Sequence, residues 1–296
     1  MADVTAVAKD VVRIIRQRRP GLARGYLSAG FGRARDGRGS TVSLFGMRVD
    51  YLDAASMFKL YRDTFVRRIY DVALPPEPVI LDCGSNIGMT VVAFKLRYPK
   101  ARITAFEPNP AAFEVLRRNV KQNGLADVTL HRKALGCQRG TLDIFVSDER
   151  PGALNTGVHA PSDWQRTRVE STVLSEYVDG PVDLLKLDVE GAESSVLHEL
   201  AEAGKLAHIR SLVCEYHHHL PRGDQRLGGT LALLEAHGFV YQIGGYCDSP
   251  PFDHRCQSDL LIYARRSERR RRRPHSVGRI RFRVPLQLPR HGRGGG

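Results

Sequence analysis

The chain has 296 residues and a formal net charge of +13, with 42% apolar and 26% charged side chains. This composition excludes a wholly disordered chain, and no stretch approaches the ~18 uninterrupted apolar residues of a transmembrane helix. The charge is uneven, because residues 265–296 carry twelve Arg and one acid, residues 1–39 carry nine basic and three acidic residues, and residues 40–264 carry 24 basic and 28 acidic residues. The middle of the chain is therefore mildly acidic, and the basicity that would suit a polyanion lies at its two ends.

The N-terminal segment predicts a short amphipathic helix. Apolar residues recur at helical spacing over 4–18, and we expect this helix to dock on the chain's own domain. Pro20 and Gly21 are expected to end it, before a Gly- and Arg-rich linker that runs to Ser40. Charged residues interrupt the apolar positions, so a signal peptide is not predicted, and five scattered cysteines favour a reducing, cytoplasmic location.

Composition divides the chain into four expected parts. These are a basic N-terminal helix and linker (1–40), a lead-in segment that packs on the core (41–77), the main domain (78–264) and an Arg-rich disordered tail (265–296). The tail has the charge to contact an anionic polymer or lipid headgroups, although a disordered, solvated tail is the favoured interpretation.

The lead-in segment predicts a hairpin followed by a helix. Residues 42–45 and 47–49 are expected to pair as two short strands. Ser56 is expected to cap a helix that continues to about Tyr70, with aromatic and apolar side chains on one face.

Strands and helices then alternate along the main domain. The predicted strands are 79–82, 102–107, 128–131, 182–188, 209–215, 239–243 and 259–263, and the predicted helices are 88–97, the one capped by Asn109 with Pro110 first, 192–203 and 224–237. Two further strands, 141–146 and 168–174, are expected to flank a polar loop as an inserted excursion. The alternation predicts an α/β fold with an open, mostly parallel sheet, helices on both faces and an antiparallel last strand.

The carboxyl ends of such strands are where ligands bind. The first strand leads into Asp82, Gly84, Asn86 and Gly88, where Gly84 permits a sharp turn and Gly88 lets the next helix approach a ligand closely. Glu107 ends the second strand, where a carboxylate can accept both hydroxyls of a ribose. The glycines do not match the G-x-G-x-x-G of a dinucleotide site, and an acid at the start of the loop suits the cationic amino group of S-adenosylmethionine better than a pyrophosphate.

A third group of acids follows the fourth strand of the main series. Asp188, Glu190 and Glu193 stand in a run that leaves an apolar strand and enters a helix. Asp188 and Glu190 are expected to face whatever lies beside the reactive carbon of the cofactor. For Glu193, stabilisation of the helix N-terminus explains the residue equally well.

Five motifs together resemble one known family. They are ILDCGSNIG at 80–88, FEPNP at 106–110, NVKQNGL at 119–125, KALG at 133–136 and LLKLDVEGAE at 184–193. With them, the segment from about Phe45 to Tyr263 resembles the FkbM family of S-adenosylmethionine-dependent methyltransferases. Residues 1–40 and 265–296 lie outside the resemblance.

The resemblance implies a class I methyltransferase (Rossmann-like) fold that methylates hydroxyl groups of sugars, glycans or natural products. By position, it implies cofactor contacts from Asp82, Gly84, Asn86 and Gly88 to the methionine part, from Glu107 to the ribose, and from Ala134 and Leu135 to the adenine. Methyl transfer needs donor and acceptor in line, and the acceptor hydroxyl must lose a proton to a base. Asp188 and Glu190 are the first candidates for that base, and His217 is the second.

Other interpretations remain open at this point. A metal site on His217–His219, or on Asp188 with Glu215, is weighed and not predicted. The rival functions are a nucleic-acid-binding protein on a degenerate methyltransferase scaffold and an NAD-dependent oxidoreductase. The expected partner is a small-molecule or glycan acceptor, without a specific nucleic acid.

Overall fold

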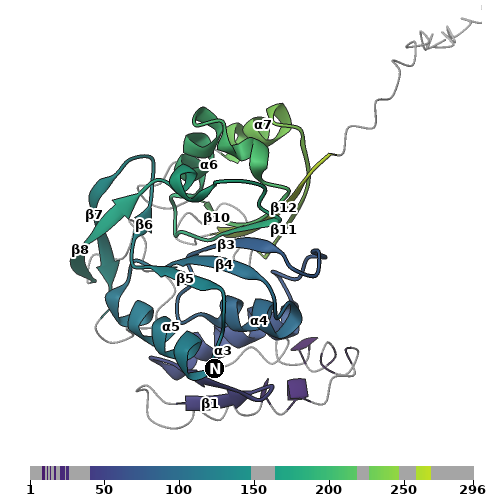
Figure 1. Ribbon diagram of the computed structural model, residues 1–296, viewed down its shortest axis with the longest axis vertical. Coiled ribbons are helices and arrows are strands. Elements are labelled where there is room, and N and C mark those ends of the chain that lie inside the picture. Colours follow the sequence, from purple (N-terminus) through teal and green to yellow (C-terminus); the bar gives the residue numbers. More distant parts are fainter. Residues whose placement is uncertain are drawn as a thin grey trace, which may run out of the picture.

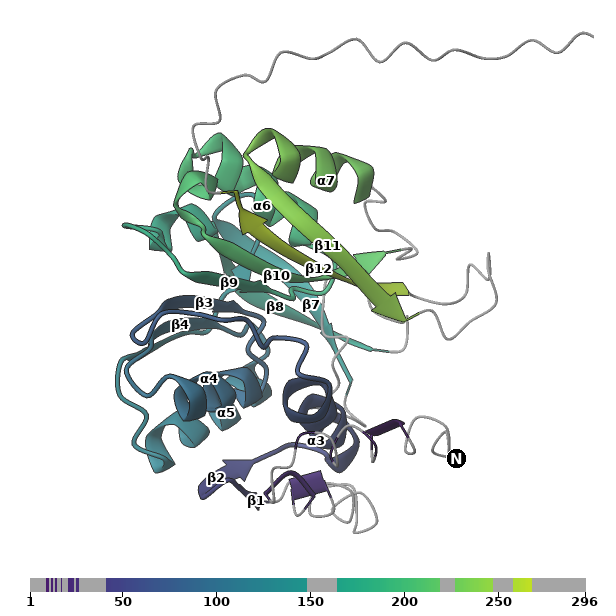
Figure 2. The same ribbon diagram turned by 90° about the vertical axis from the view of Figure 1, so that its right-hand side faces the viewer.

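A seven-stranded sheet lies between two layers of helices (Figures 1 and 2). The structure is a computed structural model that describes residues 41–147, 164–218, 227–246 and 258–267, with ten positions between Lys9 and Tyr26. In sheet order the strands are β11 (Phe239–Tyr246), β12 (Ser258–Arg266), β10 (Ser211–His218), β9 (Leu184–Leu187), β3 (Val79–Cys83), β4 (Arg102–Phe106) and β5 (Val128–His131). The β12 strand runs antiparallel to both of its neighbours, and the other pairs are parallel. The predicted fold class is confirmed, including the reversed last strand.

Each face of the sheet is covered by helices. Figure 2 shows α4 (Met89–Arg97) and α5 (Pro110–Gln122) on one face, and α6 (Glu193–Glu202) and α7 (Leu227–Ala236) on the other. Successive side chains of β3 point to opposite faces of the sheet: Ile80 packs with α4 and α5, and Leu81 packs with α6. Because both faces of the sheet are covered, the central strands are continuous apolar runs. Each fully buried aliphatic side chain contributes roughly 1.5–3 kcal/mol to the free energy of folding.

The helix α5 begins as the sequence predicts. The Asn109 side chain accepts the backbone N–H of Ala111, and Pro110 takes the first helical position. Just before this helix, the carbonyl of Phe106 at the end of β4 accepts the N–H groups of Gly84 and Ser85 at 3.0 and 2.9 Å, which holds the end of β4 against the loop after β3.

The lead-in segment differs in detail from the prediction. Strands β1 (Thr41–Leu44) and β2 (Met47–Asp50) form the expected hairpin. The helix α3 (Ala54–Tyr61) is capped by Asp53, whose side chain accepts the N–H of Ser56, so the prediction of Ser56 as the cap is wrong. The chain then continues as a π-helix over Arg62–Arg67 instead of an α-helix to Tyr70. Wider π turns of this kind occur often beside functional sites.

The described N-terminal positions pack on this segment. Leu22 is buried, and its carbonyl accepts the hydroxyl of Tyr61 at 2.8 Å. Gln17 donates to the carbonyl of Val66, and Asp10 pairs with Arg62. Positions 21–23, 25 and 26 are helical, so the prediction of a linker directly after Pro20 is wrong, while residues 18–20, where the first helix is predicted to end, lie outside the described residues. The rest of the predicted linker lies outside the described residues, as do the loop at 148–163 and the tail beyond Ser267.

A smaller sheet stands beside the main one (Figure 1). It joins β6 (Ala134–Leu135), β8 (Gln165–Thr172) and β7 (Gly140–Val146), which confirms the predicted excursion. Short 3-10 helices cover Leu174–Tyr177 and Lys205–His208. In the part of the chain that the structure describes, no helix has the length and apolar character needed to cross a bilayer.

Candidate active site

A pocket opens at the carboxyl ends of β3, β4, β9 and β10, at the edge where the sheet topology predicts ligand binding. Eight of the ten predicted site residues line this pocket: Gly84, Asn86, Glu107, Ala134, Leu135, Asp188, Glu190 and His217. The lead-in segment supplies another wall through Lys59, Asp63 and Tyr70. The pocket is therefore built from segments that are up to 158 residues apart in sequence.

The turn after β3 requires glycine at position 84. Gly84 has a φ of +83°, and a Cβ placed there would lie 1.7 Å from the carbonyl oxygen of Asp188. Any side chain would push the loops after β3 and β9 apart. Gly84 thus brings the predicted cofactor loop into direct contact with the predicted catalytic loop.

Glu107 joins the end of β4 to the same turn. Its two carboxylate oxygens accept the backbone N–H groups of Asn86 and Asn109, each at 2.8 Å. Burial raises the pKa of Glu107 to about 7. The carboxylate still borders the pocket, where the sequence placed a ribose contact.

Two predicted cofactor residues do not line the pocket. The carboxylate of Asp82 is fully buried, accepts the hydroxyl of Thr90 at 2.5 Å and lies 3.6 Å from Lys186 Nζ. A Cβ on Gly88 would lie 2.5 Å from Leu116 Cδ1, so Gly88 permits close packing of α4 on α5. Neither Asp82 nor Gly88 lines the pocket, and both shape the loop from behind, so their predicted contacts with the cofactor stay predictions.

An apolar wall lies on the opposite side of the pocket. Ala134 and Leu135 are buried, and Leu142 and Ile144 of the small sheet border the pocket with them. The short strand β6 is held in place by parallel pairing with β8. This wall is suited to pack against the flat face of an aromatic ring such as adenine.

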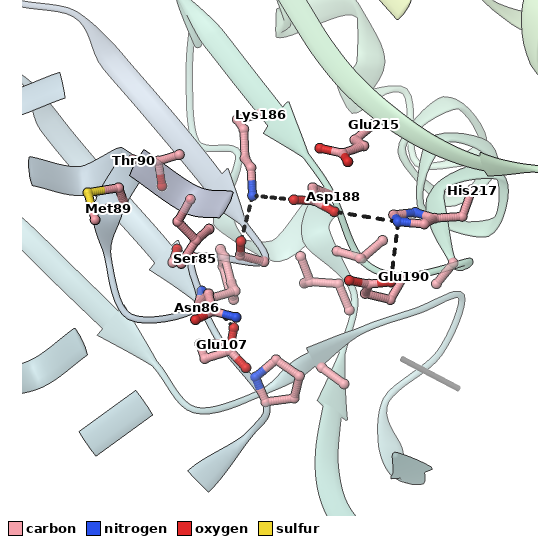
Figure 3. Close-up of a pocket in the computed structure, with 18 of the residues that line it drawn as sticks. Ser85, Asn86, Met89, Thr90, Glu107, Lys186, Asp188, Glu190, Glu215 and His217 are labelled. Atoms are coloured by element: carbon pink, nitrogen blue, oxygen red, sulfur yellow. Dashed lines mark hydrogen bonds and ion pairs between the residues drawn. The ribbon is translucent and has the colours of Figure 1, made fainter. Parts of the chain in front are cut away.

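The acidic end of the pocket brings together the three predicted catalytic residues (Figure 3). His217 Nε2 lies 3.2 Å from Glu190 Oε2 and 4.0 Å from Asp188 Oδ1. Asp188 and Glu190 come from the loop after β9, and His217 comes from the adjacent strand β10. Parallel pairing of these strands is what places residues from two distant motifs at one point.

Three further residues complete this end of the pocket and were not predicted. Lys186 Nζ lies 3.2 Å from Asp188 Oδ2 and donates to the carbonyl oxygen of Gly84 at 2.5 Å. The hydroxyl of Tyr70 donates to Glu215 Oε2 at 2.9 Å and lies 3.3 Å from Asp188 Oδ2, while Lys59 Nζ lies 3.9 Å from Glu215 Oε1. Of these residues, Lys186 could have been identified from the sequence. It lies inside an apolar strand, and a buried ammonium requires an anionic partner nearby.

These contacts give the carboxylates different proton affinities. Burial works to raise the pKa of Asp188, but the charges of Lys186 and His217 outweigh it, so this pKa lies below its ordinary value. Burial raises the pKa of Glu190 well above its ordinary value, and it raises that of Glu215 to about 7. Burial works to lower the pKa of His217, but Glu190 and Glu193 outweigh it, so this pKa is raised well above the ordinary value. Two neighbouring carboxylates with opposite shifts are typical of acid–base chemistry.

The same side chains also have the spacing of metal ligands. One ligand atom each from Asp188, Glu190 and His217 lies within 4.8 Å of the others. Carboxylate and imidazole donors of this kind can bind a divalent cation. Glu215, considered with Asp188 from the sequence, instead accepts the Tyr70 hydroxyl. The side chains of His218 and His219 lie outside the described residues.

Comparisons with known proteins show which proteins this chain resembles. A sequence profile described as "Methyltransferase FkbM domain" matches residues 82–241, which is more than half of the chain. Methyltransferase 1 of Beauveria bassiana (strain ARSEF 2860) is 31% identical over 231 residues, covering 69% of this chain and 86% of that protein. The 31-O-demethyl-FK506 methyltransferase FkbM of Streptomyces tacrolimicus is 31% identical over 229 residues, covering 66% and 86%. The 2-O-methyltransferase NoeI of Sinorhizobium fredii is 30% identical over 195 residues, covering 60% and 79%.

Proposed function

The chain belongs to the FkbM family of methyltransferases, and on this premise we propose that it methylates a hydroxyl oxygen of a sugar, glycan or natural product. Its methyl donor is S-adenosylmethionine. The observation that carries the proposal is the group of Asp188, Glu190 and His217 at the mouth of β9 and β10, inside the same pocket as Gly84 and Glu107. Two similar proteins have names that specify oxygen methylation, which supports oxygen as the acceptor atom.

The side chains around the pocket suit this cofactor. Carboxylates outnumber ammonium groups among its lining residues, which favours a cationic ligand over a pyrophosphate: Asp63, Glu107, Asp188, Glu190 and Glu215 against Lys59, Lys133 and Lys186. S-adenosylmethionine supplies an electrophilic methyl group on a positively charged sulfur. We assign Gly84 and Asn86 to its methionine part, Glu107 to its ribose, and Ala134 and Leu135 to its adenine. Asp82 and Gly88 hold the loop that carries these contacts.

The acceptor hydroxyl is assigned to the acidic end of the pocket. Asp188 is held as a carboxylate by Lys186, so it accepts a hydrogen bond from the hydroxyl and orients the oxygen. A carboxylate with a lowered pKa is a weak base, whereas the raised pKa of Glu190 makes it the stronger base near neutral pH. Glu190 therefore takes the proton, and the fixed frame of β9 and β10 keeps the oxygen in line for transfer.

The two rival functions receive no such support. An NAD-dependent oxidoreductase needs a pyrophosphate site, and the residues that line this pocket are rich in carboxylates. A degenerate scaffold that binds nucleic acid has no need to bring Asp188, Glu190 and His217 together beside the loop after β3.

Two experiments test the proposal in sequence. Calorimetry with S-adenosylmethionine, S-adenosylhomocysteine and NAD should give binding of the first two only, and a protein that bound NAD alone would refute the assignment of the pocket. The acceptor class is then read by incubating the enzyme and methyl-labelled donor with extracts of small molecules and glycans. Mass spectrometry should place the label on an ether oxygen, whereas label on nitrogen or carbon would refute O-methylation.

A further inference from the structure

His217 lies between carboxylates: Figure 3 shows Asp188 and Glu190 beside its ring, and Glu193 contacts the other ring nitrogen. Its Nδ1 lies 2.9 Å from Glu193 Oε1, and its Nε2 lies 3.2 Å from Glu190 Oε2. A neutral imidazole carries a proton on only one nitrogen, so it can donate to one of these oxygens and not to both. Carboxylate oxygens beside both ring nitrogens therefore favour the imidazolium form, in which both nitrogens donate. The side chain of His217 is only 4% exposed, so water does not compete for these contacts.

Glu193 holds this ring and the catalytic loop at the same time. Its carboxylate accepts the backbone N–H of Val189 at 3.1 Å and that of Gly191 at 3.0 Å. These two groups flank Glu190, which has a φ of +56°, a conformation that costs free energy for a residue other than glycine. Glu193 is itself almost fully buried, with an exposed fraction of 1%. One carboxylate thus fixes both the loop that carries Asp188 and Glu190 and the ring that faces them.

We propose that Glu193 is a positioning residue that keeps His217 as an imidazolium with its Nε2–H directed at Glu190 and Asp188. The consequence for catalysis rests on the proposed function: the imidazolium is a fixed cation beside the proton-accepting carboxylate. It makes His217 a hydrogen-bond donor in the resting enzyme, so the general base must be one of the carboxylates. Stabilisation of the helix N-terminus, the other interpretation of Glu193, requires no contact with His217.

The charged groups around the ring support this assignment. The loop after β9 contributes Asp188 and Glu190, α6 contributes Glu193, and β10 contributes Glu215 next to His217. Among the described residues, the ammonium groups of Lys186 and Lys59 pair with Asp188 and Glu215. In the same described part of the chain, Tyr70, Cys214 and Tyr263 are further titratable groups near these carboxylates, and the hydroxyl of Tyr70 donates to Glu215. The balance of charge that faces the ring is negative and favours the protonated imidazole.

A bound divalent cation is the competing explanation for the same geometry. In that case Nε2 of His217 would give its lone pair to the metal and would carry no proton, with Asp188 and Glu190 as the other ligands. The protonation state of Nε2 therefore separates the two explanations, and it can be measured without knowing the methyl acceptor.

The experiment is nuclear magnetic resonance of the full chain labelled with ¹⁵N-histidine. H217Q identifies the His217 signals, and spectra are recorded against pH after EDTA treatment and again after addition of Mg²⁺ or Zn²⁺. We expect both nitrogens of His217 to be protonated near neutral pH, with a titration midpoint above that of free histidine and no change on adding either metal. A neutral ring near neutral pH, or loss of the Nε2 proton on adding a metal, would overturn the proposal.

Variants of α6 identify the group responsible. E193Q should move the His217 midpoint to lower pH, because it removes a negative charge at 2.9 Å. E202Q is the matched control, since it removes the same charge from an exposed position of the same helix and should leave the midpoint unchanged. An E193Q midpoint equal to that of the wild type would sink the proposal. Should E193Q fail to fold by circular dichroism, the wild-type spectra decide the question alone.

Calorimetry with S-adenosylhomocysteine on the same samples tests the proposed function separately, because failure to bind refutes that function and leaves the His217 result standing.

Discussion

Lys186 Nζ lies 3.2 Å from Asp188 Oδ2, so a buried ammonium sets the charge of the carboxylate that we assign to the acceptor. The same ammonium donates to the carbonyl oxygen of Gly84 and lies 3.6 Å from Asp82 Oδ1. Lys186 thereby connects the loop after β3, on the cofactor side, to the loop after β9, on the acceptor side. One side chain, with an exposed fraction of 1%, therefore holds the cofactor-side loop and the acceptor-side loop together.

Replacing this lysine should be costly. We expect K186M to lower the free energy of unfolding by about 3–5 kcal/mol, because it leaves Asp82 and Asp188 buried without their cation. Chemical denaturation measures the loss. K100M is the control, since Lys100 pairs with Glu77 on the surface and its removal should change stability by less than about 1 kcal/mol. Equal effects of the two substitutions would contradict the role given to Lys186.

The acceptor-side carboxylate should affect turnover more than cofactor binding. D188N should reduce turnover by roughly 10²-fold while leaving the affinity for S-adenosylmethionine largely intact, because the amide cannot orient the acceptor hydroxyl as an anionic hydrogen-bond acceptor. Turnover is followed with methyl-labelled donor, and affinity by calorimetry. D179N, which removes a carboxylate from an exposed position, should leave both unchanged. Equal losses of affinity and turnover would indicate that Asp188 binds the cofactor, and would contradict its assignment to the acceptor.

Gly84, in the turn after β3, can be compared with a second glycine that has nearly the same backbone conformation. Gly84 and Gly46 have φ values of +83° and +84°, but a Cβ at Gly46 meets nothing within 4 Å, whereas one at Gly84 lies 1.7 Å from a backbone oxygen. G46A should cost only the roughly 1–2 kcal/mol of the left-handed conformation. G84A should cost more than that and should abolish binding of S-adenosylmethionine. Similar melting temperatures and affinities for the two variants would argue against a required close approach at Gly84.

The affinity for S-adenosylmethionine should depend on pH through Glu107. Burial raises the pKa of this carboxyl from 4.5 to about 7. The ionised form accepts hydrogen bonds and attracts a cationic ligand, so affinity should fall as the pH drops below about 7 and the group takes up a proton. The decrease is limited to about tenfold per pH unit for a single proton. Calorimetry between pH 5.5 and 8.5 measures it, and E107Q should bind more weakly with a flatter pH profile. If the affinity of the wild type depended on pH as little as that of E107Q, the assignment of Glu107 to the ribose would be contradicted.

The sequence by itself determined the strand order along the chain and eight of the ten residues assigned to the site that do line the pocket. These are consequences of local rules: buried parallel strands are apolar runs, Asn109 and Pro110 begin a helix, and parallel strands present their carboxyl ends at one edge. Local rules also misplaced the cap of α3, because Asp53 and Ser56 are both good N-cap residues and only the observed hydrogen bond distinguishes them.

Only the tertiary structure decided how the acids are paired. Tyr70 and Asp188 are 118 residues apart, and their contact depends on where the lead-in segment packs, which no local pattern encodes. Packing likewise assigned Gly88 to the contact of α4 with α5 and turned Asp82 toward Lys186 and Thr90. The charge of a buried carboxylate depends on which cations and donors lie within a few ångströms of it. For Asp188 and Glu190, those neighbours come from four separate elements that meet only in the folded protein.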